Sequence, residues 1–242
     1  MKRSLLLLIP LLVFTAAPYA AVTHWYFYPA GAKPAGMPPD SATVTNLALA
    51  TWQQVQVDGN APTIAFGGDE AGHAETNYAG RQPALLLVSV SNAYSYLPTA
   101  PVGAWLYLYL FGGANSNPTV GIDVARIASA WSESTVTWGS GPSYSGNATG
   151  FSPSQPGLNN TISVDVYNAV NAEYGDTPAN RRGFALKDTQ AESPYFFAKE
   201  TPVAAYRPFL LVIVPEPGAL LALFAVVMAR CELRRMRDAC RT

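Results

Sequence analysis

The chain has 242 residues, of which 49% are hydrophobic and only 13% are charged. Its two cysteines, Cys231 and Cys240, lie near the C-terminus, so residues 22–213 can form neither a disulfide nor a cysteine metal site. This central region carries eight Lys and Arg against thirteen Asp and Glu, a net charge of −5. An acidic region does not attract phosphate backbones, which excludes nucleic acid as an expected partner.

The N-terminus has the layout of a secretory signal peptide. Two basic residues precede an apolar stretch over residues 5–14, and small residues follow it. The pattern predicts a signal peptide over residues 1–21, cleaved after Ala20 or Ala21. The alternative is an N-terminal anchor that stays attached, which Pro10 within the apolar stretch disfavours.

The central region is long enough for one large domain and consists of apolar segments separated by turn-rich loops. Strands are predicted over residues 22–28, 51–57, 63–66, 84–90, 104–111, 120–127, 135–138, 162–166, 184–187, 195–199 and 209–214. So many short strands predict an all-β fold, a β-sandwich over residues 22–213. One helix is expected over 166–174, ending at Gly175, and a long surface loop is expected over 140–160.

One predicted strand is hydrophobic on both faces. Within residues 104–111 three aromatic residues alternate with three leucines. They are Trp105, Tyr107 and Tyr109 on one face and Leu106, Leu108 and Leu110 on the other. Because successive strand residues point to opposite faces, the leucines and the aromatic rings are expected on opposite sides of a sheet.

No catalytic motif is present. The chain contains no nucleophile elbow, no phosphate-binding loop and no dinucleotide fingerprint. A glycoside hydrolase needs two facing carboxylates, and nothing in the sequence pairs the available ones. These candidates are Glu133, Asp165, Glu173 and Glu192. The sequence therefore predicts a protein that is not an enzyme.

A short acidic segment is the only candidate metal site in the sequence. It offers Asp69, Glu70, His73 and Glu75 as ligands, among which the carboxylates suit calcium better than zinc. A single histidine without strict ligand spacing is a weak signal. No metal or other cofactor is expected, and the simpler interpretation of the segment is a solvated acidic loop.

The C-terminal segment, residues 214–242, has three parts. It begins with Val214, Pro215, Glu216 and Pro217, continues with an apolar run over 218–229, and ends in a basic tail that includes Arg230, Arg234, Arg235 and Arg237. As a helix the run would be about 18 Å long, against a hydrocarbon core of about 30 Å. The short hydrophobic helix with arginines after it predicts a membrane stop that inserts only transiently.

The same layout resembles a PEP-CTERM sorting signal, with Pro215, Glu216 and Pro217 at the motif positions. The resemblance implies export across the inner membrane of a Gram-negative bacterium and recognition by an exosortase that cleaves near the motif. The protein would then reach the cell surface or the extracellular matrix. The alternative is an ordinary C-terminal helix packed on the domain after a proline-rich linker.

Several central segments resemble one known family. They are residues 81–88, 103–109, 130–143, 182–186, 196–200 and 207–212, in this order. The most specific runs from Trp131 to Trp138 and contains an acidic residue followed by Thr-Val-Thr-Trp. Together they resemble the DNRLRE domain, also described as carbohydrate-binding module family 96. The resemblance implies a jelly-roll-like antiparallel β-sandwich on an exported protein that binds polysaccharide, in some members an acidic one such as alginate.

Four residues are the candidates for sugar contact. They are Trp131, Trp138, Phe197 and Lys199. Aromatic rings can stack on sugar rings, and a lysine can contact an acidic sugar. The alternative is that both tryptophans pack in the core and that Lys199 pairs with Glu200 across strands.

These observations lead to one preferred function and two alternatives. The preferred function is an exported, non-enzymatic β-sandwich that associates with extracellular or surface polysaccharide. The second is a structural surface or biofilm-matrix protein without sugar binding. The third is a polysaccharide lyase or hydrolase that uses Glu133 or Lys199.

Overall fold

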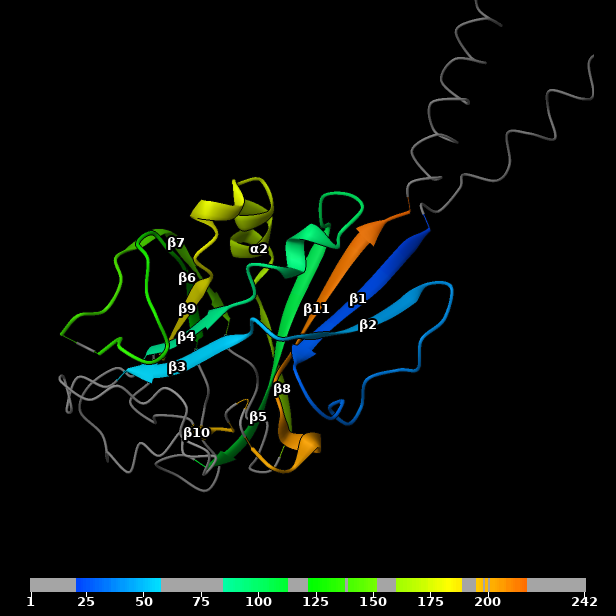
Figure 1. The fold of residues 1–242 in the computed structure, drawn as a ribbon, viewed down its shortest axis with the longest axis horizontal. Helices are drawn as coiled ribbons and strands as arrows, with labels where there is room; N and C mark the ends of the chain where they lie inside the picture. Colours follow the sequence, from blue (N-terminus) through cyan, green and yellow to red (C-terminus); the bar gives the residue numbers. More distant parts are fainter. Residues whose placement is uncertain are drawn as a thin grey trace, which may run out of the picture. The chain divides into compact units, whose positions relative to one another are not determined.

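The computed structural model describes residues 21–57, 85–112, 122–137, 139–151, 160–188, 195–197, 199 and 201–216. They form two β-sheets packed face to face, which confirms the predicted all-β sandwich (Figure 1). Among these residues no helix is long and apolar enough to cross a membrane. The apolar run 218–229 lies outside the described residues.

The larger sheet, called sheet A, has six strands. They are β1 (Val22–Pro29), β2 (Val44–Leu49), β5 (Gly103–Gly112), β8 (Asn160–Asp165), β10 (Tyr195–Phe196) and β11 (Phe209–Pro215). The long strand β5 pairs antiparallel with β8, with β11 and, at its far end, with β10. Beyond β11 follow β1 and then the edge strand β2.

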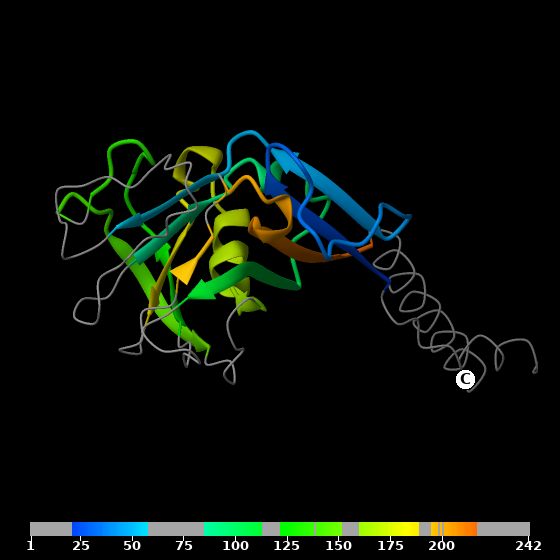
Figure 2. The ribbon, with the colours of Figure 1, turned by 90° about the horizontal axis from the view of Figure 1, so that it is seen from below.

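The smaller sheet, called sheet B, has five strands in the order β3-β4-β9-β6-β7. They are β3 (Gln53–Val57), β4 (Leu85–Ser89), β6 (Ile122–Ile127), β7 (Tyr144–Phe151) and β9 (Phe184–Asp188). Every pair whose register is established in this sheet is antiparallel. Figure 2 shows the two sheets as separate layers.

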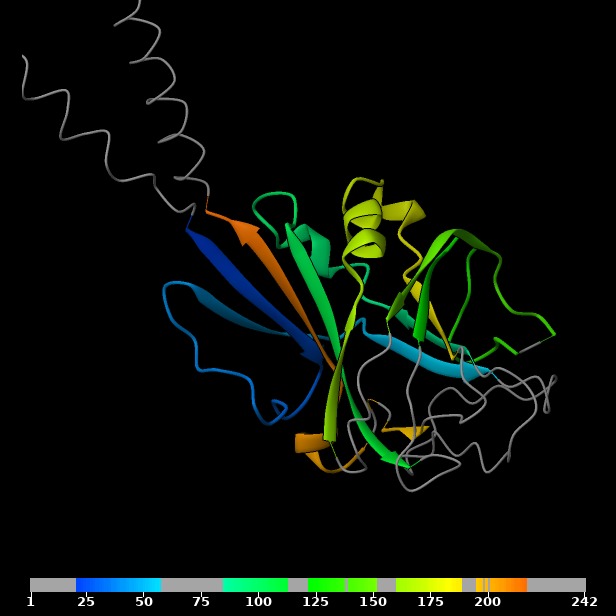
Figure 3. The same ribbon diagram turned by 180° about the vertical axis from the view of Figure 1, so that it is seen from behind.

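The core lies between the sheets and follows the alternation of the strands. Leu106, Leu108 and Leu110 of β5 are fully buried in it, whereas the aromatic residues between them point the other way. Helix α2 (Tyr167–Tyr174) packs at one end of the sandwich, where Ala169 and Val170 join the core (Figure 3). It ends at Gly175, as predicted, but with an ordinary helical φ of −70°.

Three short 3-10 turns complete the described structure. They are η1 (Ala93–Ser95), η2 (Pro178–Asn180) and η3 (Ala204–Tyr206). Tyr94 of η1 is buried in the core, and η3 leads into β11.

The structure differs from the sequence prediction in four places. The described part of the segment predicted as a strand over 135–138 is not a strand: a turn ends at Thr135, and the N–H groups of Thr135 and Val136 both donate to the carbonyl of Ser132. The predicted loop over 140–160 contains β7, whose pairing with β6 outweighs its Gly- and Asn-rich composition. Strand β10 is shorter than the predicted 195–199.

The fourth difference is the unpredicted strand β2. It runs parallel to β1, whereas an antiparallel sandwich was expected. Residues 30–43 supply the connection of a dozen or more residues that a parallel pair needs. The predicted strand over 63–66 lies outside the described residues.

Candidate functional site

The outward face of sheet A carries a row of three packed aromatic rings, here called the central rings: Tyr26, Tyr107 and Phe209. The register places Tyr107 of β5 directly beside Phe209 of β11, and their rings stack at 4.5 Å with an interplanar angle of 9°. Tyr26 of β1 lies on the other side of Phe209, with ring centroids 6.0 Å apart. Because one residue from each of three adjacent strands contributes, the row runs across the strands.

A second cluster, here called the end rings, lies farther along β5 and consists of Tyr109, Phe197 and Tyr206. The N–H of Phe197 donates to the carbonyl of Tyr109 over 3.1 Å, which continues the pairing of β10 with β5. Turn η3 brings the ring of Tyr206 to 4.3 Å from Tyr109 and 4.9 Å from Phe197. The central and end rings together are called the aromatic face.

Three tyrosines of the aromatic face have a raised pKa. Partial burial raises the pKa of Tyr26, Tyr107 and Tyr109 above the ordinary value, and neighbouring tyrosines raise two of these pKa values further. A protonated phenol both donates and accepts hydrogen bonds. The face therefore combines apolar ring surface with neutral hydrogen-bonding groups, and all its rings except the buried Phe209 are partly exposed.

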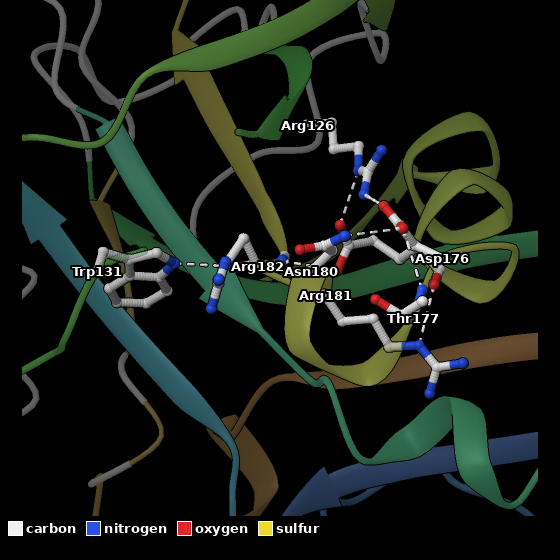
Figure 4. Close-up of polar contacts among 9 residues, drawn as sticks. Arg126, Trp131, Asp176, Thr177, Asn180, Arg181 and Arg182 are labelled. Atoms are coloured by element: carbon white, nitrogen blue, oxygen red, sulfur yellow. Dashed lines mark hydrogen bonds and ion pairs between the residues drawn. The ribbon is translucent and has the colours of Figure 1, made fainter. Parts of the chain in front are cut away.

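The outward face of sheet B is different, because the chain covers it with its own side chains. Leu87, Ile127 and Ala185 form a small buried cluster there with Val136, and Trp131 packs against that cluster. The indole Nε1 of Trp131 donates to the carbonyl of Arg182 over 2.8 Å (Figure 4). Trp131 thus anchors the segment that follows β6 onto sheet B.

Lys199, another candidate for sugar contact, forms an ion pair with Glu133 over 2.6 Å. Each of the two side chains is 17% exposed. The pair connects the segment after β10 to the segment that contains Trp131. The predicted partner of Lys199 was Glu200, which lies outside the described residues.

A buried polar network holds helix α2 against sheet B. The carboxylate of Glu173 is fully buried, and it accepts hydrogen bonds from Nε of Arg126 (2.8 Å) and from the N–H of Gly183 (2.9 Å). Burial raises the pKa of Glu173, and the hydrogen bonds from Arg126 and the backbone oppose this shift. Arg126 also pairs with Asp176, whose pKa this contact lowers (Figure 4).

Arg181 extends the same network to the core. Its guanidinium donates to the carbonyls of Glu173 and Tyr174 over 3.1 and 3.3 Å, and it lies 5.4 Å from the ring centre of Tyr94. All these contacts are internal to the fold. Glu173, which the sequence offered as one half of a hydrolytic pair, therefore has a structural role.

The structure describes only part of the predicted site residues. It brings Phe197 into the end rings and keeps Trp131 on the other sheet. Val214 and Pro215 end β11, and the N–H of Glu216 donates to the carbonyl of Ala21 over 2.8 Å. Outside the described residues lie Trp138, Glu192, Pro217, Asp69, Glu70, His73, Glu75, Arg230, Arg234, Arg235 and Arg237. Within the described residues, no three His, Cys, Asp or Glu side chains gather as a metal site would require.

Sequence reasoning missed most of the aromatic face. The alternation of Trp105, Tyr107 and Tyr109 was a visible signal for it, but the partners Tyr26, Tyr206 and Phe209 come from distant segments. It also missed Arg126, Asp176 and Arg181, for which the sequence carries no local signal.

The chain is similar to one protein family over most of its length. The model of carbohydrate-binding module family 96 matches residues 49–213. No curated protein matches the chain at a significant level. The matched stretch includes all of sheet B and five of the six central and end rings, and leaves out β1 with Tyr26. The chain belongs to carbohydrate-binding module family 96.

Proposed function

We propose that this protein is an exported, non-enzymatic protein that associates with extracellular or surface polysaccharide through the aromatic face of sheet A. The observation that carries the proposal is the gathering of six aromatic rings on an outward sheet face of a carbohydrate-binding module. Aromatic rings bury the apolar faces of sugar rings, and tyrosine hydroxyls exchange hydrogen bonds with sugar hydroxyls.

The export part of the proposal rests on the two ends of the chain. Residues 1–21 have the layout of a signal peptide, and residues 214–242 resemble a PEP-CTERM sorting segment. An exosortase is the expected processing partner, and insertion into the inner membrane would be transient. The DNRLRE-type domain would then be released to, or held at, the surface of a Gram-negative cell.

Affinity electrophoresis of the full chain through gels that contain single polysaccharides tests this function. We expect retardation by at least one polysaccharide, and loss of most of it in Tyr26→Ala, because truncation of a contacting aromatic side chain costs about tenfold or more in affinity. Tyr96→Ala is the matched control, since Tyr96 is 50% exposed and belongs to neither ring group. A wild-type chain that no gel retards would overturn the proposed function.

A structural surface protein without sugar binding is the second candidate. The stacking of the rings on one another favours this candidate, because that packing already buries part of the ring surface. This candidate predicts that Tyr26→Ala lowers stability and leaves every gel mobility unchanged.

A further inference from the structure

We propose that the ligand of the aromatic face is an uncharged hexose polymer that lies across the strands of sheet A, over the central rings and between Ser163 and Asn46. The inference rests on the proposed function and narrows it to one row of side chains and one class of polysaccharide.

The row is continuous across five neighbouring strands. Ser163 of β8 pairs with Tyr107 of β5, which pairs with Phe209 of β11. Tyr26 of β1 packs its ring against Phe209, and it pairs with Asn46 of β2. With neighbouring strands about 4.8 Å apart, the row is about 19 Å long. It presents aromatic rings in the middle and the hydroxyl of Ser163 at one end, whereas at the other end the amide of Asn46 already donates to Pro38 and Asp40.

The outward positions of sheet A carry little charge. Among the paired residues of β1, β2, β5, β8 and β11 the outward positions that carry a side chain are, by register and alternation, His24, Tyr26, Tyr28, Val44, Asn46, Ala48, Trp105, Tyr107, Tyr109, Thr161, Ser163, Asp165, Phe209, Leu211 and Ile213. They include one carboxylate and neither lysine nor arginine. A polymer of uronic acids would therefore meet no permanent positive charge along the row.

A carboxylate also lies near each end of the row. At the β2 end Asp40 accepts hydrogen bonds from the backbone N–H and the side-chain amide of Asn46, over 2.7 and 2.8 Å. These bonds lower the pKa of Asp40 and keep it ionised. At the β8 end lies Asp165, two residues from Ser163 on the same face. Lys33 lies close enough to Asp40 to offset part of its charge, so Asp165 is the carboxylate that repels a polyanion more strongly, and a neutral chain is unaffected by either.

The described cations near this face lie at its margins, and two of them, Lys33 and Arg207, donate to backbone carbonyls and keep their charge. Nζ of Lys33 donates to the carbonyl of Pro38 over 2.7 Å, and Lys199 forms its ion pair with Glu133. Nε of Arg207 donates to the carbonyl of Thr201 over 2.9 Å. None of them belongs to the outward positions of the five strands that form the row.

The test compares four polysaccharides on the full chain: a soluble β-glucan and a galactomannan, which are neutral, and alginate and polygalacturonate, which are acidic. Affinity electrophoresis is run at low salt and at about 0.5 M NaCl, where the screening length is only a few ångströms. We expect a neutral polysaccharide to retard the chain equally at both salt concentrations. The acidic ones should not retard it.

Variants locate the contact. Tyr26→Ala and Tyr107→Ala should each weaken the neutral interaction about tenfold or more, and Tyr96→Ala should leave it unchanged. Tyr26→Phe and Tyr107→Phe keep the rings and remove only the hydroxyls, so they test the row even where an alanine variant does not fold. Each phenylalanine variant should weaken the interaction a few-fold.

Three results would overturn the inference, and each has a different consequence for the proposed function. Retardation by alginate that high salt abolishes, without a neutral ligand, would refute the uncharged ligand and keep the proposed function. Binding of a neutral polysaccharide that depends on Tyr206 but not on Tyr26 or Tyr107 would show that the ligand contacts the end rings and not the central rings. Absence of any retardation would remove the proposed function itself.

Discussion

The outward faces of both sheets carry aromatic residues, but these residues pack differently on the two faces. On sheet B the chain folds back, and Trp131 and Val136 cover Leu87, Ile127 and Ala185. On sheet A the rings of the aromatic face pack mainly on one another, and most of them stay partly exposed. An aromatic side chain that covers its own sheet stabilises the fold, whereas partly exposed rings on an outward face offer surface to another molecule.

Two glycines with positive φ, one beside each sheet, differ in the space around them. At the start of β9 the backbone of Gly183 approaches that of β4, and its N–H donates to the buried Glu173. Around the connection between β1 and β2, Gly36 has open space about it. These two glycines allow a direct comparison of a crowded and an open position.

The largest expected effect is that of Gly183→Ala. Gly183 has a φ of +91°, and a Cβ at this position would overlap the carbonyl oxygen of Val88 and lie 2.8 Å from Cα of Ser89. We expect the free energy of unfolding of the full chain to fall by about 4 kcal/mol or more, as measured by urea denaturation.

Gly36→Ala is the matched control, since the φ of Gly36 is +82° and no atom lies within 4 Å of a Cβ at this position. It should cost only the left-handed backbone conformation, about 1 to 2 kcal/mol. Equal losses in the two variants would contradict this assignment.

The next effect separates a covering ring from a binding ring. Trp131→Ala removes a partly buried indole and its hydrogen bond to Arg182, so we expect a loss of about 2 to 3 kcal/mol in unfolding free energy. Polysaccharide retardation of the folded variant should be unchanged. Tyr26→Ala should show the opposite balance, with a loss of about 1 kcal/mol and weakened retardation. Urea denaturation and affinity electrophoresis on both variants provide the two measurements. Reduced retardation in Trp131→Ala alone would reverse the roles of the two faces.

The sequence predicted the fold class because the core depends on local alternation. In β5 the three leucines face the core and the three aromatic residues face outward, as expected from a period of two. Helix α2 and its end at Gly175 were also evident from local spacing. Strand β2 was missed, although Thr45, Leu47 and Leu49 alternate toward the core, because its parallel partner β1 lies across a long connection.

The site was less predictable, because it depends on contacts between distant segments. The Trp131 to Trp138 segment is the most specific family motif, yet its described part covers sheet B. Of the three described residues proposed for sugar contact, Phe197 alone lies in the aromatic face. Tyr26 and Phe209 are far apart in the sequence and meet only through the order of strands in sheet A. A single sequence does not encode this order in any local pattern.

The smallest expected effect concerns alkaline pH and again distinguishes the faces. The pKa values of Tyr26 and Tyr107 are raised in the folded chain, so between the ordinary value of about 10 and the raised value the folded state binds more protons than the unfolded state. The unfolding free energy should therefore be constant with respect to these groups below pH about 10 and should decrease as pH rises above it.

Urea denaturation in this range should show a shallower decrease for the double variant Tyr26→Phe/Tyr107→Phe. Tyr144→Phe on sheet B is the control, because Tyr144 is 40% exposed and its pKa is raised by burial alone. Tyr144→Phe should change the dependence of the unfolding free energy on pH less than the double variant does, because it removes only one titrating phenol. An unchanged slope in the double variant would show that the central tyrosines titrate alike in the folded and unfolded chains, and that their hydroxyls are as solvated as those of an open surface.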